Sequence, residues 1–534
     1  MTTLLLGGRI HSTTHPDATA MAVRDGTVAW LGSDDVARKQ YPDAQVVDLD
    51  GGFVAPAFVD AHVHTTATGL ALTGLDLGEA RSREHCLELI AAAAATLDGA
   101  VLWGHGWDET RWPQPVAPTV EEIDAVVGSR PVYLTRIDAH SAVAGSALRD
   151  RTDGLATALG YHPQHPLSAD AHHRVRAAAR NLLTPQQRAA ARTAALDAFA
   201  AHGVVAVHEC AGPDIGGVDD WVELRDTTHG VQVSGYWGEA VETPEQAREL
   251  LAATGAAGLA GDLFVDGALG SHTAWLRDPY ADAPDCCGNA YLGAEAVLAH
   301  LRACTGAGIT AGFHVIGDAA VTVVVDAFEA LVAELGVPAV ARCGHRLEHL
   351  EMVDAEAARK LGSWGIVASM QPNFDARWGG PDGMYARRLG AERAAGLNPL
   401  AMLASAGVPL AFGSDTPVTG LNPWSTVRAA TLHQTPGSAI SARAAFGAAT
   451  RGAWRAAGVN DGLTGTLVPG APASYAVWDS DDLVVAAPAD TVERWSTDPR
   501  SRVPALPALD ADVPLPRCRQ TVHRGEVLFG GLHD

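Results

Sequence analysis

The central part of the chain, residues 53–464, alternates short apolar runs with alanine-rich segments. This alternation is typical of parallel strands covered by helices, because each helix carries the chain back to begin the next strand in the same direction. Eight runs are predicted as strands: residues 57–64, 204–208, 231–236, 262–266, 310–315, 346–349, 366–371 and 409–415. Eight such strands favour a (β/α)8 barrel of the TIM type, within the α/β fold class.

Alanine-rich helices are predicted around these strands. They cover residues 84–97, 185–202, 243–253, 295–305, 319–335 and 442–457. The first two strands are separated by residues 65–200, a connection far longer than one helix requires. We predict that residues 65–200 form an insertion that caps the site and contains two apolar runs of its own, at 101–104 and 132–136.

Both ends of the chain are predicted to be rich in strands. Residues 1–52 and 465–534 contain short apolar stretches separated by turn signals such as Asp25-Gly26 and Gly51-Gly52. We therefore predict one small β-sandwich domain built from both termini, beside a barrel domain at residues 53–464.

The net charge limits the kinds of partner that are expected, and the cysteine pattern indicates the cellular compartment. The net charge is 38 − 62 = −24, which argues against nucleic acid or an anionic membrane as a partner and favours a small-molecule substrate. The seven cysteines are scattered and include no Cys-x-x-Cys motif, which fits a reducing cytoplasm. No signal peptide and no apolar run of membrane-spanning length is recognised. A homodimer is possible.

Two histidines end the first predicted strand. His62 and His64 are two residues apart, so on a strand they face the same side, with Asp60 below them. Neutral imidazole is the commonest nitrogen ligand of divalent metals in proteins. This spacing alone is weak evidence for a metal site.

Further potential ligands end later predicted strands. His314 and His349 end the fifth and sixth strands, and Asp415 ends the eighth. The C-terminal strand ends of a barrel converge on its active site. One histidine at a strand end is more often a packing residue, but five such residues together indicate a metal centre.

These residues and their neighbours resemble the amidohydrolase superfamily, in particular its YtcJ-like branch of metal-dependent hydrolases (the amidohydrolase 3 type). The resemblance spans nearly the whole chain and is carried by motifs at residues 56–64, 106–112, 136–140, 266–271, 314–318, 346–349 and 413–417. It implies a barrel with a two-ended β-sandwich.

The resemblance also implies roles for the strand-end residues. His62 and His64 would bind a first metal, and His314 and His349 a second. Asp415 would contact the first metal and transfer the proton, so that it and His349 count as the catalytic residues. The expected metal is Zn²⁺, as one or two ions, with Mn²⁺ or Fe²⁺ as alternatives.

The chain departs from the family pattern at the fourth strand. Many relatives have a lysine there, which becomes carboxylated and bridges two metals, whereas this chain has Asp262. Asp262 could ligate one metal, bridge two, or hold a ligand histidine. Glu209 is another possible bridging carboxylate, and the number of metals stays open. Two further departures, Ala57 for glycine and Ser474 for aspartate, are expected to leave catalysis intact.

Several polar and aromatic residues are candidates for substrate binding. They are His140, Trp107, Arg111, His272 and Asp318, with Trp112, Trp275 and Trp378 as possible apolar walls. Ordinary packing is the alternative for each tryptophan, and Asp318 could instead cap the helix that begins at residue 319.

The favoured function is metal-dependent hydrolysis of a non-peptide carbon–nitrogen bond, in an amide or N-formyl compound, by a metal-activated water. A deaminase or an ester hydrolase on the same site plan is the alternative within this fold. A relative that binds ligand without catalysis is the alternative from another class. A phosphate-binding loop and a serine-nucleophile elbow are both absent from the sequence.

Overall fold

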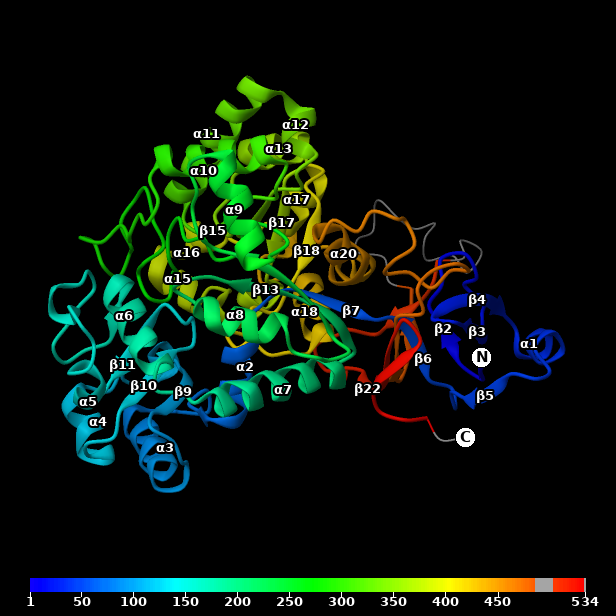
Figure 1. The fold of residues 1–534 in the computed structure, drawn as a ribbon, viewed down its shortest axis with the longest axis horizontal. Helices are drawn as coiled ribbons and strands as arrows, with labels where there is room; N and C mark the ends of the chain where they lie inside the picture. Colours follow the sequence, from blue (N-terminus) through cyan, green and yellow to red (C-terminus); the bar gives the residue numbers. More distant parts are fainter. Residues whose placement is uncertain (486–502, 533–534) are drawn as a thin grey trace.

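The computed structural model describes residues 1–485 and 503–532. Its central strands are parallel and pair in two runs, β14-β13-β7 and β15-β16-β17-β18 (Figure 1). They span β7 (Phe58–Val63), β13 (Val204–Ala211), β14 (Gln232–Trp237), β15 (Gly312–Val315), β16 (Arg346–His349), β17 (Val367–Met370) and β18 (Leu410–Phe412). The arrangement is a TIM-barrel-type fold of α/β character.

Isolated parallel bridges join the two runs of strands. Val63 at the end of β7 pairs with Thr416 beyond β18. On the other side, residues 258–264 lie between β14 and β15, with Tyr236 bridged to Gly258 and Leu259 to Ala311.

The fourth predicted strand, residues 262–266, is wrong as a regular strand. In the described structure, the strand pairing of this segment is limited to one isolated bridge, from Phe264 to His314. Gly261 has a positive φ of 75°, which interrupts the extended backbone that a ladder needs. A Cβ at Gly261 would lie 3.2 Å from Cys210, so the segment bends where it passes close to β13.

Five of the six predicted helices are present as continuous helices. They are α3 (Arg83–Thr96), α7 (Pro185–Ala201), α9 (Pro244–Thr254), α10 (Ala294–Ala307) and α11 (Asp318–Leu335). Capping boxes fix the starts of two of them: Thr184 exchanges hydrogen bonds with Gln187 at α7, and Thr243 does so with Gln246 at α9.

The sixth predicted helix, residues 442–457, is divided. It consists of α19 (Ala442–Gly447), a π-helical segment (Ala448–Gly452) and α20 (Ala453–Ala456). A Cβ at Gly452 would lie 2.5 Å from the Leu410 carbonyl oxygen. The π turn therefore falls where the helix passes closest to strand β18.

Residues 65–200 contain a sheet of their own, in the order β12-β11-β10-β9-β8. Its strands are β8 (Leu75–Asp76), β9 (Leu102–Trp107), β10 (Val132–Arg136), β11 (Ser141–Ala144) and β12 (Leu167–Ser168). They are accompanied by α2 (Thr65–Thr73), α4 (Val120–Val127), α5 (Ser146–Arg149) and α6 (Ala169–Arg180), besides α3 and α7. The two apolar runs predicted here are β9 and β10. Figure 1 shows α3 to α6 as a lobe opposite the chain termini.

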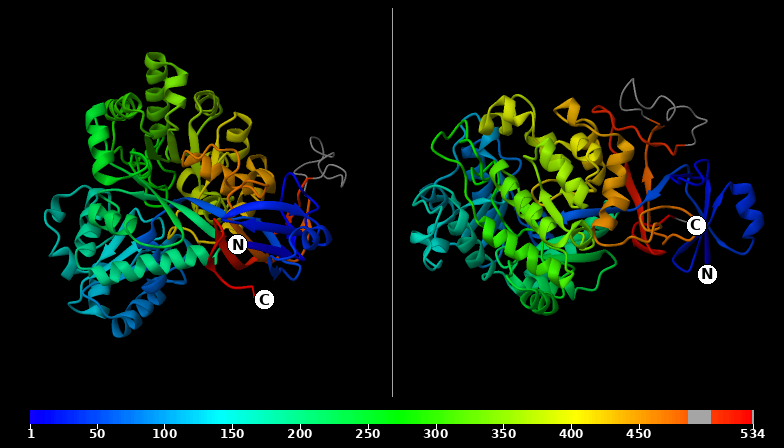
Figure 2. Two further views of the ribbon diagram at one scale, coloured as in Figure 1. Left: turned by 45° about the vertical axis from the view of Figure 1, so that its right-hand side comes forward. Right: turned by 90° about the horizontal axis from the view of Figure 1, so that it is seen from above.

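The two ends of the chain meet in neighbouring sheets (Figures 1 and 2). One sheet has the order β4-β3-β1-β5 and the other β2-β6-β19-β22-β23. Their strands are β1 (Thr2–Leu6), β2 (Arg9–Ile10), β3 (Ala20–Arg24), β4 (Thr27–Gly32), β5 (Gln45–Asp48), β6 (Phe53–Pro56), β19 (Tyr475–Asp479), β22 (Arg517–His523) and β23 (Glu526–Phe529).

A single apolar cluster joins these sheets, with Leu5, Met21, Val54, Val477 and Val522 among its members. Strand β6 begins at Phe53, yet it pairs with β2 and β19 rather than with a barrel strand. The proposed division of the chain after residues 52 and 464 stays a prediction.

None of the helices in the described ranges is both long and apolar enough to cross a membrane. The seven cysteines all lie within those ranges, and none forms a disulfide.

Candidate metal centre

Strand β7, which carries the two histidines, is held tightly against the loop that follows β18. Asp60 on β7 accepts hydrogen bonds from the backbone N–H of Ser414 at 2.8 Å and of His62 at 3.3 Å. Burial raises the pKa of Asp60 to about 6 although these hydrogen bonds act to lower it. A Cβ at Gly413 would lie 2.4 Å from the His62 nitrogen. Only glycine therefore lets this loop lie so close to the His-x-His strand.

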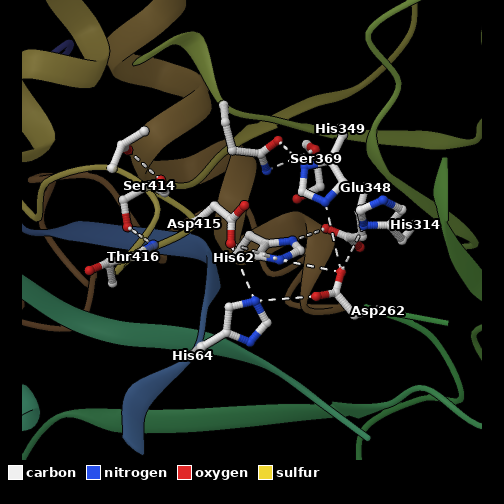
Figure 3. A network of polar contacts seen from close by, with 12 residues as sticks. His62, His64, Asp262, His314, Glu348, His349, Ser369, Ser414, Asp415 and Thr416 are labelled. Atoms are coloured by element: carbon white, nitrogen blue, oxygen red, sulfur yellow. Dashed lines mark hydrogen bonds and ion pairs between the residues drawn. The ribbon is translucent and has the colours of Figure 1, made fainter. Parts of the chain in front are cut away.

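Four imidazoles surround the carboxylate of Asp262 (Figure 3). Asp262 Oδ1 lies 3.4 Å from His314 Nδ1, 3.6 Å from His62 Nε2 and 3.8 Å from His349 Nε2. Its other oxygen, Oδ2, lies 3.2 Å from His64 Nε2. The structure thus brings residues from three strand ends and the bent segment 258–264 to one point.

Asp415 faces the same centre from the side of β7. Its Oδ1 lies 3.3 Å from His64 Nε2 and 3.5 Å from His62 Nε2. Its backbone N–H donates to the His62 carbonyl oxygen at 2.9 Å. Asp415 and His349 have positive φ angles of 54° and 70°, a conformation that non-glycine residues adopt at a cost and that is concentrated at functional sites.

The outer nitrogens of three of the four candidate ligand histidines have partners of their own, whereas His64 Nδ1 is buried without one among the described residues. His62 Nδ1 lies 2.9 Å from Glu348 Oε2, and His349 Nδ1 lies 2.7 Å from Gln371 Oε1. His314 Nε2 lies 3.3 Å from the Gly267 carbonyl oxygen. Such contacts fix the ring orientation, so that the inner nitrogens point at Asp262.

Glu348 is in turn held by a buried arginine. Arg346 Nη2 donates to Glu348 Oε2 at 3.0 Å, to the Ala61 carbonyl oxygen at 2.7 Å and to Ser369 Oγ at 3.0 Å. Burial acts to raise the pKa of Glu348, but the Arg346 charge and the contact with His62 outweigh burial and hold that pKa well below its usual range. Glu348 is therefore an ionised acceptor for the His62 Nδ1–H.

The inner atoms of the cluster fit a divalent metal. Four of them are buried without a hydrogen-bond partner in the described part of the chain: His62 Nε2, Asp262 Oδ1, His314 Nδ1 and Asp415 Oδ1. Buried polar atoms are normally paired. Four overlapping groups have ligand atoms within 4.8 Å of one another among the described residues: His62-His64-Asp262, His62-His349-Asp415, Asp262-His314-His349 and, behind His62, His62-Cys210-Glu348. Imidazole and carboxylate together are a donor set that suits a divalent transition metal.

The electrostatics of the cluster also favour a cation. Burial acts to lower the pKa of His64, but Asp262 and Asp415 raise it, to about 9 on balance. Two carboxylates therefore attract positive charge at this point. A divalent ion can supply that charge in place of protons.

Two cavities adjoin the cluster. The larger, of about 90 Å³, is lined by His64, Asp262, His314, His349 and Asp415. Its other walls come mainly from the insertion and the segments after β13 and β18, with Trp103, Tyr133, Arg176, Arg180, Leu183 and Ile215 among them. The smaller cavity, of about 30 Å³, is lined by His140, Phe374, Trp378 and Tyr385 among others. The cluster therefore adjoins space that a small molecule can enter.

Of the substrate-binding candidates, His140 lies at the site. It lines both cavities, and its ring centroid is 5.0 Å from that of His314. A network in the insertion holds it there. Asp138 accepts the His140 backbone N–H at 3.2 Å and is bound by Arg136 and Ser271, each at 2.8 Å. The hydrogen bonds of the motif at residues 136–140 thus position His140.

Two polar candidates and Trp107 lie elsewhere. Arg111 is exposed at the end of a short 3-10 helix (Glu109–Arg111). Trp107 is buried in the core of the insertion, with its Nε1–H donated to the Leu134 carbonyl oxygen at 2.9 Å. His272 pairs with Asp282 at 2.9 Å. None of the three lines either cavity, so each of these assignments is corrected to a structural role or a surface position.

Asp318 and three tryptophans complete the set. Asp318 is the first residue of α11 and accepts the Arg277 backbone N–H at 3.0 Å, so it lies at the helix start and outside both cavities. Trp112 packs in the core of the insertion, and Trp275 against the barrel core. Among the four tryptophans predicted as candidates, counting Trp107, Trp378 is the one that lines a cavity, the smaller of the two.

Glu209 does not join the ligand groups of the described residues. Its Oε2 accepts the Thr65 backbone N–H at 2.8 Å, at the start of α2, and it lines the larger cavity. Burial raises the pKa of Glu209 to about 7, against the opposing effect of His64. Asp262, rather than Glu209, is the carboxylate at the centre of the histidines.

The sequence reasoning missed the walls that the insertion contributes. Trp103, Tyr133, Arg176 and Arg180 belong to no recognised motif, and their position depends on how β9, β10 and α6 dock over the barrel. Glu348 lies in the motif at residues 346–349, and its position next to a ligand histidine could have suggested its role.

A family model described as amidohydrolase family matches residues 45–529. The chain belongs to this family. It is 27% identical over 523 residues to the Arabidopsis thaliana protein LONG AFTER FAR-RED 3, covering 88% of this chain and 86% of that one. It is 26% identical over 449 residues to the putative amidohydrolase YtcJ of Bacillus subtilis, covering 78% and 80%.

A solved structure is also similar to this amidohydrolase-family chain. It is an uncharacterized metal-dependent hydrolase from Pyrococcus furiosus, with a TM-score of 0.69 and 26% identity, covering 90% of this chain and 99% of that one. The family and this neighbour support hydrolase activity that depends on a divalent metal, and the residue groups described above offer ligands for it.

Proposed function

We propose that the protein hydrolyses a non-peptide carbon–nitrogen bond, as in an amide or an N-formyl compound, of a small-molecule substrate. The observation that carries the proposal is the Asp262 carboxylate among four histidines, with Asp415 beside them and a cavity of about 90 Å³ in front. A segment of 153 residues, 28% of this chain and 27% of the relative, is 28% identical to an N-substituted formamide deformylase of Arthrobacter pascens, which supports this bond type.

The proposed ligands are assigned to two sets that share Asp262, and the contacts of Asp415 with His62 and His64 support its place in the first. His62 and His64, with Asp415, would hold one divalent ion, and His314 and His349 a second, with Asp262 between them. Zn²⁺ is the proposed ion, because imidazole and carboxylate are its usual ligands in hydrolases. When bound, such an ion polarises a substrate carbonyl and lowers the pKa of a coordinated water.

The residues of the chain carry the remaining chemistry. Asp415 is proposed to accept the proton of the attacking water and to donate it to the leaving nitrogen. His140 lies at the junction of the two cavities, which supports a role in orienting the scissile carbonyl. Glu348 and Gln371 keep the rings of His62 and His349 in place during the reaction.

The test compares Asp415→Asn with the parent on matched substrates. We expect zinc-loaded parent protein to hydrolyse N-formyl or N-acetyl amines faster than the corresponding esters and aminoheterocycles. Asp415→Asn should lower kcat by about 10²–10⁴-fold, the usual contribution of a positioned acid–base group. Asp43→Asn, an exposed aspartate in the N-terminal segment, is the matched control.

The outcomes separate the alternatives. Unchanged turnover in Asp415→Asn would contradict the role of Asp415. Faster turnover of an aminoheterocycle or an ester than of any amide would replace the proposed bond type, and absence of turnover in metal-loaded protein would favour a binding protein.

We also propose that the two terminal sheets form one composite β-sandwich domain. Their shared apolar cluster, which contains Leu5, Val54 and Val477, supports this division of the chain.

A further inference from the structure

Three arginines line the larger cavity together with the candidate metal ligands. Arg176 and Arg180 lie on α6 of the insertion, and Arg188 lies on α7. Arg188 is paired with Glu223 at 2.8 Å. Arg180 donates to the Ile215 carbonyl oxygen, and its side chain is within 4.0 Å of no carboxylate in the described ranges. Arg176 forms neither a hydrogen bond nor an ion pair with any residue that the structure describes.

The carboxylates that line this cavity outside the metal cluster already have partners. Asp220 binds Arg192 at 2.9 Å and accepts from Thr66 at 2.9 Å. Asp138 is bound by Arg136 and Ser271, and Glu209 by the Thr65 backbone N–H. The guanidinium of Arg176 is therefore uncompensated.

The surroundings of Arg176 make this lack of a partner costly. Its Nε is buried and has no acceptor among the described residues, and a buried donor without an acceptor costs about 1–3 kcal/mol, or more if it is charged. Neighbouring His172 and His173 do not supply a negative charge that could balance Arg176. Burial, and next the Arg176 charge, lower the pKa of each, so both rings are neutral. Arg176 as a whole is half-buried and lines the cavity, so its guanidinium is available to an anionic ligand there.

Arg176 lies within reach of the reaction centre. The ring of His173, one helical turn earlier on α6, is 5.7 Å from Phe264, and Phe264 is 4.8 Å from His314. Arg176, Phe264 and His314 line the same cavity, and so do the apolar residues Leu183 and Ile215. A small substrate that fills this cavity can therefore contact both the candidate metal ligands and Arg176.

We propose that Arg176, with Arg180 beside it, binds a carboxylate of the substrate, so that the substrate is an amide bearing a carboxylate across a short apolar spacer. This inference rests on the proposed hydrolase function and names its substrate class. A carboxylate matches a guanidinium in a bidentate pair. A phosphate dianion fits less well than a carboxylate, because it brings twice the negative charge into a small cavity that Glu209 and Asp220 also line.

The experiment measures binding and turnover separately. Binding to zinc-loaded protein is measured by calorimetry for succinate, glutarate and adipate, each beside its half-amide, so that every ligand offers one carboxylate to the metal centre and only the diacid offers a second. The parent is compared with Arg176→Met, Arg176→Lys and the control Arg174→Met. Arg174 is exposed on the same helix and pairs with Asp170.

We expect at least one diacid to bind the parent roughly tenfold to a hundredfold more tightly than its half-amide, the range of a charge-assisted hydrogen bond. Arg176→Met should abolish that ratio, Arg176→Lys should keep part of it, and Arg174→Met should leave it unchanged. In turnover, Arg176→Met should lower kcat/KM for N-formylphenylalanine but not for N-formylphenylalaninamide.

A ratio near one in the parent, or a ratio that survives in folded Arg176→Met, would overturn the proposal. Tighter binding of inorganic phosphate than of every diacid, lost in Arg176→Met, would replace the carboxylate by a phosphate group. Metal content and turnover of uncharged amides report on the hydrolase function independently, so that its failure would be recognised as a separate result.

Discussion

Asp262 Oδ1 and His314 Nδ1 lie 3.4 Å apart, and neither atom makes a hydrogen bond within the described residues. Two buried polar atoms that face each other without a hydrogen bond are both unsatisfied, unless a third atom binds to both of them. The same carboxylate faces His62, His64 and His349. A divalent ion shared between these ligands accounts for the whole arrangement, and it explains how an aspartate can stand where relatives of this family are expected to have a lysine.

Glu348→Gln tests how the ring of His62 is held. The neutral amide keeps the shape but loses the charge that pairs with Arg346 and accepts from His62 Nδ1. We expect metal affinity to fall by about 10–100-fold, as is usual when such a partner of a ligand histidine is removed. Competition with a chromogenic chelator measures the affinity. Glu356→Gln, on an exposed glutamate near Lys360, should leave it unchanged.

Gly413→Ala tests the close contact between the β18 loop and β7. The added methyl group would lie 2.4 Å from the His62 nitrogen and 2.9 Å from Asp60 Oδ1. Relief of that clash requires backbone movement, so we expect a loss of about 1–3 kcal/mol in the free energy of unfolding and weaker metal binding. Gly420→Ala is the matched control, since its Cβ would meet no atom within 4 Å. Equal stability of the two variants would contradict the contact.

His345 predicts a specific response to acid. Burial, and then the neighbouring His300, lower the pKa of His345 to about 4. Its Nδ1 accepts the Ala311 backbone N–H at 2.9 Å, which only a neutral ring can do. The unfolded chain takes up this proton near pH 6.5, so the stabilisation is fully present above that pH and is lost as the pH falls toward 4.

His345→Asn keeps an acceptor near Ala311 but removes the titration. Between pH 7.5 and pH 5 the parent should lose about 2 kcal/mol more of its free energy of unfolding than this variant, measured by urea unfolding at each pH. His165→Asn, on an exposed histidine, should lose as much as the parent. The same loss in all three proteins would show that His345 does not titrate in this range.

Much of the fold could be predicted because apolar strand segments alternate with alanine-rich helix segments along the chain. His62 and His64 were recognisable because a strand directs both side chains to one face, and His314, His349 and Asp415 because each ends a predicted strand, although β18 ends at Phe412 and Asp415 lies in the loop after it. Residues 262–266 were mistaken for a regular strand because Gly261 takes a positive φ that the apolar pattern does not reveal. The π turn in residues 442–457 likewise depends on a tertiary contact at Gly452.

The lining of the two cavities was harder to predict, because tertiary packing decides which residues contribute to it. Trp107 and Arg111 lie in one motif, yet one packs in the core of the insertion and the other is exposed. Arg176 is an ordinary helix residue in the sequence and lines the pocket only because α6 docks over the barrel. That Arg176 lacks a partner can be recognised only when the position of the insertion over the barrel is known.

The most direct test of the metal centre is the metal content per chain, determined by elemental analysis of protein produced with added zinc, for the parent and for Asp262→Ala. We predict tightly bound zinc in the parent and less in the variant. Two ions falling to one or fewer would identify Asp262 as the bridge between two metals. No bound metal in the parent under any zinc or manganese loading would contradict the account.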